Sequence, residues 1–595
     1  MRERMQATHK LIFSAIRNPV RAGRLHLFAA LLIIGLLGCD SPEQTKTEET
    51  ASVVNFLHGG TLRIIHNEPG SLDPMEVDDV YESGITNNIY DGLVRLNESC
   101  QLQPHLAGTW IVSPNGREYQ FELRPDVRFS DGTPFCALDV VVTLASILSP
   151  LKSCQPFAET YIEMIEGSKA FRRGEAPWPS GLLAPDSLTV NIRLEEPLAT
   201  FLLALTMDQV RIVRWKERID LIPNGLKSLT GYVSQEILDS AYTNKLGKDP
   251  ERMFLPGTGP FIPVEWIPLD HVTLIRNPDY WGGEPGVDSL LFIIRQSWSA
   301  EEILRLFRNR EVEMTFVPRG KEEEMRRDYG ARIDVGHELS FSFIGFRMDR
   351  PPFDQVLFRR AMAHAINVEK LAALDPEFAQ AASGILPPGM PGYSPEIQRL
   401  PFNPEAARSN LAQLGYSPAN PVPACTLFTT PSSDPEQPFD LSIQEDLAAV
   451  GIPLVIEYVE WTELDEGAVD GKLGLFSFGW VADLPDPDSF FYFLFHTQGD
   501  NNLFSFSDPV VDELIEEART SRGAERWEIY RRLEGIILAK APIIPLRNTS
   551  QLTAWQPYVM GVRPSPMGPQ MMPLERIHLI PKEQALEAIC KKDRP

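Results

Sequence analysis

The chain has 595 residues, of which 43% are hydrophobic and 23% are charged, a composition typical of folded globular proteins rather than disordered or fibrous ones. At roughly 150 residues per domain, this length predicts about three or four domains with a sizeable core. The net charge of −25 argues against a nucleic-acid-binding protein, which needs a basic face for the phosphates. No apolar run reaches the roughly 18 residues of a membrane-spanning helix, so none is expected in the mature chain.

Residues 1–38 are interpreted as a targeting segment. Residues 1–24 carry six basic side chains and one acidic one, and an apolar stretch follows from Leu25 to Leu37. A basic region before a short apolar core is typical of a secretory signal. The stretch ends in Leu36-Leu37-Gly38-Cys39, which resembles the lipobox of bacterial lipoproteins. The resemblance implies cleavage before Cys39 and acylation of its sulfur; the alternative is a buried strand with an ordinary cysteine.

Residues 39–54 are polar and aperiodic, which predicts a flexible tether with a mean reach of about 20 Å. Two or three acyl chains on Cys39 would anchor the protein durably, whereas one chain binds weakly. In enterobacterial lipoproteins, an aspartate such as Asp40 after the lipidated cysteine is associated with retention in the inner membrane. We therefore expect a protein anchored to the outer face of the cytoplasmic membrane, in the periplasm or cell envelope.

Five further cysteines follow Cys39, so at least one of them is unpaired. Pairing among Cys100, Cys136 and Cys154 is suggested by their proximity in the sequence alone. Cys590 lies in the polar tail formed by residues 583–595 and is expected to be free. No CxxC pattern occurs, which leaves zinc-ribbon and thioredoxin-like sites unsupported.

The first half of the chain predicts short strands and one well-marked helix. Residues 110–112 and 118–124 flank an Asn-Gly turn and alternate in polarity, which predicts a β-hairpin. A turn at residues 130–134 leads into a helix from Ala137 to Ile147, with Asp139 in the first turn, where a carboxylate suits the helix dipole. His271–Arg276 alternates and ends at Asn-Pro, which predicts a strand.

Four helices are predicted in the second half. Asp354 is expected to cap an apolar helix that reaches Ile366. Asn403-Pro404 begins the next helix and Gly415 ends it. Asp508-Pro509 begins a third, which runs through Arg519, and the fourth spans residues 524–539. Strands and helices alternate along the chain, so the predicted class is α/β or mixed.

Catalytic and metal-binding motifs are absent from the sequence. It contains no P-loop, GxSxG, HExxH or EF-hand pattern, and no GxGxxG after a strand. Isolated histidines such as His364 are interpreted as ordinary core or surface residues, because real metal sites have characteristic ligand spacings. A catalytic triad need not be contiguous, so a hydrolase stays open as a third alternative. We predict no enzyme activity, no cofactor and no metal site.

Read in order, several segments resemble the family 5 extracellular solute-binding proteins, the oligopeptide- and dipeptide-binding lipoproteins of ABC importers. The resemblance covers residues 60–580, and many pieces in one order make it specific. The segments are Ser71-Leu72-Asp73-Pro74, Ile89–Val94, Pro104–Ala107, Trp110–Ser113, Phe129–Phe135, Asp139-Val140, Gly257–Phe261, Trp266, Arg276–Trp281, Arg359–Met362, Ala365-Ile366 and Gly479–Asp483.

The resemblance implies a type II periplasmic-binding-protein fold, in which two α/β lobes close on a ligand about a hinge, with an extra domain. It places lobe I at 55–95, 198–336 and 546–582, the extra domain at 96–197, and lobe II at 337–545. The implied function is capture of an extracytoplasmic ligand and its delivery to the ABC permease and ATPase by a protein expected to be monomeric. Ligand contacts that form only in the closed state shift the population towards closure.

Asp483 is the principal ligand-binding candidate. In peptide-binding relatives the acid of the GW-x-x-D motif pairs with the α-amino group of the ligand, and Asp483 occupies that position. A buried carboxylate needs a cation or several hydrogen-bond donors. The alternative is a turn residue among Asp483, Asp486 and Asp488, and the latter two are assigned that role. Trp480 is the candidate for lining the pocket, whereas most aromatic residues between 476 and 495 are expected in buried strands.

Val80, Tyr81 and Glu82 lie where relatives present a strand-like edge to the peptide backbone, which would favour sequence-tolerant capture. An exposed loop is the alternative there. Some tripeptide-binding relatives carry an arginine, two residues before the Gly-Trp, that binds the ligand carboxylate. Ser477 occupies this place, so the sequence identifies no carboxylate partner. Other relatives take nickel complexes, haem, opines or sugars, and the second hypothesis is a lipid-anchored sensory or interaction protein without import.

Overall fold

The structure is a computed structural model that describes residues 59–581, with the exception of residues 78, 153, 155–157, 244–253 and 432–436. The predicted signal segment, the tether, the lipidation site Cys39 and the tail with Cys590 lie outside the described residues. Within the described ranges, no helix combines the length and the apolar character needed to cross a membrane.

Twelve strands of the described chain form one mixed sheet. One half contains β16, β15, β17 and β13, with β15 parallel to both of its neighbours. The other half contains β11, β1, β10, β9 and β8, with β1 parallel to β10 and β11. The bounds are β1 Thr61–Asn67, β8 Phe261–Ile267, β9 His271–Arg276, β10 Ser289–Arg295, β11 Met314–Phe316, β12 Arg332–His337, β13 Ser340–Phe346, β14 Ala379–Ala381, β15 Cys425–Thr429, β16 Leu454–Tyr458 and β17 Leu475–Val481.

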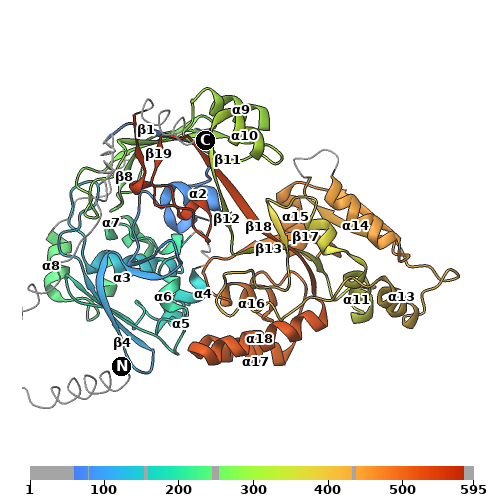
Figure 1. Ribbon diagram of the computed structural model, residues 1–595. Coiled ribbons are helices and arrows are strands. Elements are labelled where there is room, and N and C mark those ends of the chain that lie inside the picture. The colour runs from blue at the N-terminus through green and yellow to red at the C-terminus, as the bar shows by residue number, and fades with distance from the viewer. Residues whose placement is uncertain are drawn as a thin grey trace, which may run out of the picture. The chain divides into compact units, whose positions relative to one another are not determined.

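The two halves meet on β18 (Ile543–Trp555), the long strand that runs diagonally in Figure 1. Its residues 543–549 pair with β13 and β14, and its residues 550–555 pair with β12 and β11. Thirteen residues at a rise of about 3.3 Å make this strand roughly 43 Å long. One continuous strand therefore contributes hydrogen bonds to both lobes of the α/β fold.

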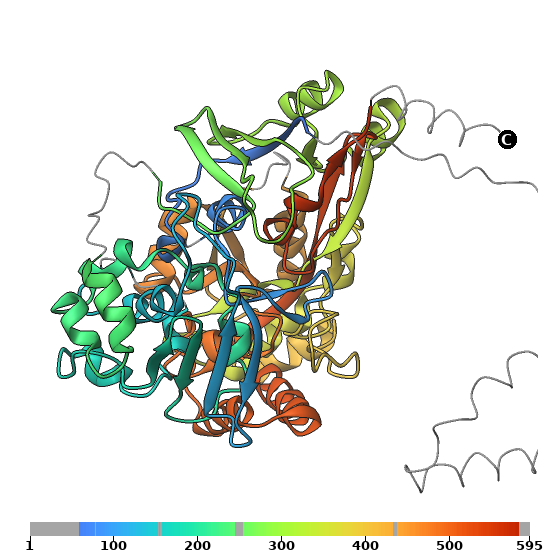
Figure 2. The same ribbon diagram turned by 90° about the vertical axis from the view of Figure 1, so that its left-hand side faces the viewer.

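A separate four-stranded sheet has the order β4-β5-β7-β6, and its strands appear at the lower front of Figure 2. The strands are β4 Ala107–Val112, β5 Glu118–Leu123, β6 Leu182–Asp186 and β7 Thr189–Arg193. β4 and β5 form the predicted hairpin, with Gly116 at φ 72° in its turn. The predicted helix is α3 (Ala137–Ile147), where the Asp139 carboxylate accepts from the Cys136 N–H. The core of this part continues from residue 198 to Ala241.

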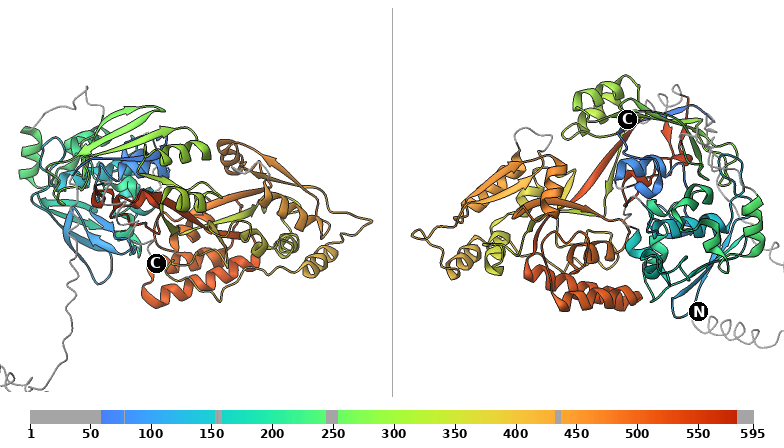
Figure 3. Two further views of the ribbon diagram at one scale, coloured as in Figure 1. Left: turned by 45° about the horizontal axis from the view of Figure 1, so that its top comes forward. Right: turned by 180° about the vertical axis from the view of Figure 1, so that it is seen from behind.

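The helices of the second half follow local capping signals. Asn403 accepts from Ala406 N–H at the start of α13, and Asp508 caps α17, whose first residue is Pro509. α17 and α18 pack side by side, as Figures 1 and 3 show. The principal helices are α2 Val80–Thr86, α8 Gln235–Thr243, α9 Ala300–Arg308, α10 Glu322–Tyr329, α11 Val356–Ala365, α12 Val368–Ala372, α13 Pro404–Gln413, α14 Pro438–Ala448, α15 Trp461–Val469, α16 Asp488–Phe495, α17 Pro509–Thr520 and α18 Gly523–Lys540.

Two predictions about local structure are wrong. Asp354 does not cap α11, because its backbone N–H closes the preceding turn on Arg350 O and Gln355 occupies the cap position. The aromatic residues from Phe490 to Phe495 are largely buried as predicted, but they form α16 rather than a strand. Pro487 occupies the cap position of this helix and Asp488 is its first residue. A carboxylate in that position suits the helix dipole.

The suggested disulfide among Cys100, Cys136 and Cys154 is also wrong, because all three thiols are free. Cys136 stands at the N-cap of α3, whereas Cys100 packs against the core of the second lobe. Cys154 lies beside the backbone carbonyl of Met75. Proximity in the sequence thus does not bring these sulfur atoms together.

Gly345 on the central strand β13 lies where the packing leaves little room for a side chain. A Cβ at Gly345 would lie 2.6 Å from the ring of Phe476 and 2.7 Å from the ring of Phe504. We expect Gly345→Ala to lower the free energy of unfolding by about 1–3 kcal/mol because a well-packed core must shift. Urea denaturation measures this change. Gly479→Ala on β17 is the matched control, since its nearest atom is 3.9 Å away; equal losses in both variants would contradict the prediction.

Candidate functional site

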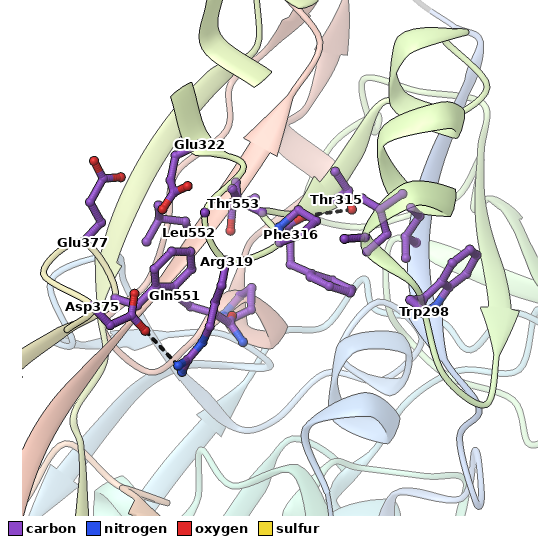
Figure 4. A pocket seen from close by; sticks show the side chains of 18 of the residues that line it. Trp298, Thr315, Phe316, Arg319, Glu322, Asp375, Glu377, Gln551, Leu552 and Thr553 are labelled. Carbon is purple, nitrogen blue, oxygen red and sulfur yellow. Dashed lines mark hydrogen bonds and ion pairs between the residues drawn. The ribbon is translucent and has the colours of Figure 1, made fainter. Parts of the chain in front are cut away.

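A cavity of about 1460 Å³ lies beside β18 and is lined from both halves of the large sheet. One wall comes from β1, α2, β11 and the start of α10, and the other from β15, the start of α14 and β17. Figure 4 shows Phe316 and Trp298 on one side of the pocket and Asp375 on the other. The cavity therefore sits where the two lobes meet.

Some charged side chains that line this cavity have an oppositely charged partner in the described chain, and others do not. Arg319 forms an ion pair with Asp375 at 2.8 Å, drawn as the dashed line in Figure 4. Asp440 accepts a hydrogen bond from Tyr458 Oη at 3.2 Å. Burial raises the pKa of both Asp375 and Asp440 above the usual range. Arg547 stacks its guanidinium over the ring of Phe439, 3.8 Å from the centroid, and makes no ion pair with a described residue.

The strand-like edge predicted at Val80, Tyr81 and Glu82 is wrong, because these residues form the first turn of α2. Asp79 caps this helix by accepting from the backbone N–H groups of Tyr81 and Glu82, so these groups are not available to pair with a peptide strand. Asp79 followed by Glu82 three residues later is a helix-start pattern that the sequence already contained.

The side chains of Val80, Tyr81 and Glu82 have two different roles. Val80 and Tyr81 line the cavity and are 42% and 41% exposed, unusual for large apolar groups in the interior of a site. Glu82 is buried and accepts from the N–H of Ser71 at 2.9 Å, so it holds the loop that precedes α2. Val80 and Tyr81 thus offer an apolar surface to a bound molecule, and Glu82 does not.

Trp480 and Asp483 are not among the residues that line this cavity. Both are tied to Ser489 at the start of α16: Trp480 Nε1 donates to Ser489 O at 2.7 Å, and Asp483 N donates to Ser489 Oγ at 2.9 Å. Ser489 Oγ in turn donates to the Asp483 carboxylate at 3.3 Å. The Gly-Trp segment and the following loop are therefore held rigidly against one helix terminus.

The Asp483 carboxylate lies in a poorly solvated place without a cation. No arginine or lysine of the described chain forms an ion pair with it, and burial raises its pKa to about 6, with Asp208 adding to the shift. Its loop neighbour Asp486 has the opposite environment, because Arg526 donates to it at 2.7 Å and both side chains are buried. Of these two acids, only Asp486 has its charge balanced within the protein.

The sequence analysis missed Arg547 and Phe439 as members of the site. The available signal was a single arginine in the otherwise apolar and neutral segment from Ile543 to Leu552, but periodicity alone does not indicate which face it occupies. Ser477, the position where some relatives carry an arginine, does line the cavity. In the described part of the chain, no cluster of three or more His, Cys, Asp or Glu residues has the geometry to hold a metal.

Comparison with known proteins was made on both sequence and structure. The family model described as "Bacterial extracellular solute-binding proteins, family 5 Middle" matches residues 101–502. Di/tripeptide-binding protein 2 of Pseudomonas aeruginosa is 28% identical, over 84% of this chain and 91% of its own length. Heme-binding protein A of Haemophilus influenzae is 26% identical, over 91% of this chain and 97% of its own.

A solved structure agrees with these sequence matches. The periplasmic binding protein DppA from Helicobacter pylori, solved in complex with peptide STSA, superposes with a TM-score of 0.70 at 25% identity. The match covers 88% of this chain and 99% of that chain. The two-lobe, type II periplasmic-binding fold expected from the sequence is confirmed by this likeness together with the family match.

Opposite stability effects are predicted for the two loop aspartates. At pH 7.5 Asp483→Asn should raise the free energy of unfolding, by at most about 3 kcal/mol, because it removes an ionised carboxylate whose folded pKa is about 6. Asp486→Asn should lower it by about 3–5 kcal/mol, because the Arg526 guanidinium then stays buried and unpaired. Urea unfolding measures both changes.

The pH dependence of the stability gained by Asp483→Asn is the control for this prediction. A folded pKa above the unfolded value of about 3.9 makes the cost of Asp483 complete above pH 6 and absent below pH 4. The gain from Asp483→Asn should accordingly disappear at pH 4. A loss of stability in this variant at pH 7.5 would show that the carboxylate has a stabilising partner.

Proposed function

Since this chain belongs to family 5 of the bacterial extracellular solute-binding proteins, we propose that it is the lipid-anchored substrate-binding component of an ABC importer. It captures extracytoplasmic peptides, or other amine-bearing solutes, by closing its two lobes, and it delivers them to a permease. As in its family, solutes are bound and not chemically transformed, so the chain is not an enzyme.

The observation that carries this proposal is the cavity between the two halves of the sheet. Its volume of about 1460 Å³ exceeds the roughly 300–1,000 Å³ of pockets for drug-sized molecules, which suits an extended oligomeric ligand. Because both lobes contribute its walls, a ligand gains its full set of contacts only when the lobes approach each other. Binding energy then shifts the population towards the closed state.

The proposed lobes keep the boundaries given by the sequence, with lobe I at 55–95, 198–336 and 546–582, the extra domain at 96–197 and lobe II at 337–545. The change of pairing partners near residue 550 of β18 supports a lobe boundary inside this strand. The core around the four-stranded sheet also includes residues from Leu198 to Ala241, so part of the segment proposed for lobe I packs against the extra domain.

A peptide is the favoured ligand class because several relatives named for peptide binding or transport match the chain over most of its length, although the haem-binding relative does so too. Asp483 supplies the recognition of an amine, from outside the described lining of the cavity: its carboxylate is partly buried, has no ion-pair partner in the described chain and lies near a second acid, Asp208. A ligand ammonium would provide the missing counter-charge. Trp480, which donates to the backbone carbonyl of the same Ser489, is proposed to pack beside that amine.

Capping the ligand amine tests this role. Native mass spectrometry of protein purified from its own cell envelope should reveal bound small peptides. Resynthesised peptides should lose at least about 30-fold in affinity when N-acetylated, because loss of one partner from a desolvated ion pair costs about 2 kcal/mol or more. Isothermal titration calorimetry measures this ratio, and Asp483→Asn should abolish it. Acetylated and free peptides that bind the wild-type protein equally would contradict the amine assignment.

The pH dependence of binding provides a second readout on the same residue. A carboxylate with a pKa of about 6 is mostly ionised at pH 7 and about one-tenth ionised at pH 5. Affinity for an amine ligand should therefore fall about tenfold between these values in the wild-type protein. Asp483→Asn should show no such fall, since the substituted side chain does not titrate.

Membrane attachment through Cys39 is a separate part of the proposal. Cys39→Ser removes the sulfur that would be acylated. Metabolic labelling with radioactive palmitate should mark the wild-type protein and leave the variant unlabelled. Label on Cys39→Ser, or an unlabelled wild-type protein, would contradict the lipid anchor but not the binding function.

A further inference from the structure

Arg547 occupies a fixed position at the junction of the lobes. Its backbone lies opposite Ser342 of β13 and opposite Ala381 of β14, so hydrogen-bonded strands hold it on both sides. Its side chain lines the cavity and stacks on Phe439, the second residue of α14. A guanidinium stacked on an aromatic ring keeps its N–H groups free to donate hydrogen bonds in the plane of the guanidinium.

Arg547 forms no ion pair within the described chain. Three charged residues influence it: Arg319, Asp375 and Asp440. Asp375 is engaged by Arg319 and Asp440 by Tyr458, and neither forms an ion pair with Arg547. The Nε of Arg547 is buried and finds no hydrogen-bond partner in the described chain. Burial, together with Arg319, lowers the pKa of Arg547 to about 10, so it remains charged at neutral pH.

Apart from Arg547, the charged side chains described around the cavity are acids and one arginine that is already paired. The acidic lining residues of the described chain outnumber the basic ones, and the second guanidinium, Arg319, is already neutralised. His66 lines the cavity too, but burial lowers its pKa to about 4 and keeps it neutral. The acidic residues are Glu322, Glu323, Asp375, Glu377 and Asp440. A ligand anion thus finds one favourable partner here.

We propose that Arg547 binds the carboxylate of the captured ligand and sets its selectivity for free acids. The inference rests on the proposed peptide-binding function and deepens it by naming the second charged end of the ligand. A planar guanidinium matches a carboxylate through two parallel hydrogen bonds. Arg547 supplies this guanidinium from β18. Ser477 on β17, where some relatives carry an arginine, lines the same cavity but has no charge.

The sheet register gives the approximate length of such a ligand. Gly479 and Arg547 both lie opposite Ser342, so two inter-strand spacings, about 10 Å, separate them. β17 ends at Val481, two residues before Asp483, so the register gives the span only to the end of that strand. Gly479 to Val481 adds about 7 Å along the strand, so its end lies about 12 Å from Arg547. Since an extended chain advances about 3.4 Å per residue, a peptide of at least about three or four residues is needed to reach from Arg547 towards Asp483.

The experiment compares tetra-alanine with tetra-alanine amide by calorimetry on the full-length protein. Wild-type protein should bind the free acid at least about tenfold more tightly than the amide. Arg547→Gln should reduce this ratio to about twofold or less, and Arg547→Lys should retain part of it. The double variant Arg319→Gln/Asp375→Asn is the matched control, which should preserve the wild-type ratio because it removes a charge pair that is already balanced.

Two results overturn different claims. Equal binding of acid and amide by the wild-type protein, or an unchanged ratio in Arg547→Gln, overturns the carboxylate assignment alone, provided that N-acetylation still weakens binding. Failure of the wild-type protein to bind any of tri-, tetra- and penta-alanine, together with native protein that carries no peptide, overturns the proposed function. Persisting sensitivity of Arg547→Gln to N-acetylation confirms that this variant is folded.

Discussion

The hydrogen bonding of β18 is the constraint on which the rest of the structure depends. Its first half belongs to the ladder with β13 and β14, and its second half to the ladder with β12 and β11. Backbone N–H and C=O groups in a sheet interior must be paired, so the strand cannot leave either half without exposing them. A motion of the proposed lobes that keeps both ladders intact would twist or bend this strand near its middle, beside the cavity.

Charge compensation distinguishes the structural part of the chain from the site. The buried pair of Asp486 and Arg526 and the partly exposed pair of Arg319 and Asp375 are complete within the protein. Asp483 and Arg547 are not compensated in this way, and both have pKa values shifted by burial towards the neutral form. Such groups reduce stability in the absence of a partner, which is the reason for proposing both as ligand contacts.

Local signals predicted much of the secondary structure. The Asn-Gly hairpin, the helix at 137–147 and the helices begun by Asn403 and Asp508 follow from turn and capping chemistry that acts within a few residues. Two local predictions are wrong, because Val80–Glu82 is helical and capped by Asp79, and Asp354 belongs to the turn before α11. The order of short motifs was sufficient to identify the fold family.

The sequence by itself determined the fold class, the family and the position of the Gly-Trp segment, because these depend on short-range chemistry and motif order. Only the tertiary structure decided which charges are satisfied. Asp483 and Asp486 are three residues apart in one loop, yet Arg526 from α18 reaches only the second. Likewise, only the tertiary structure shows that Arg547 stacks on Phe439 and that Asp375 pairs with another arginine. Pairing between residues distant in sequence is fixed by packing, and no local pattern encodes it.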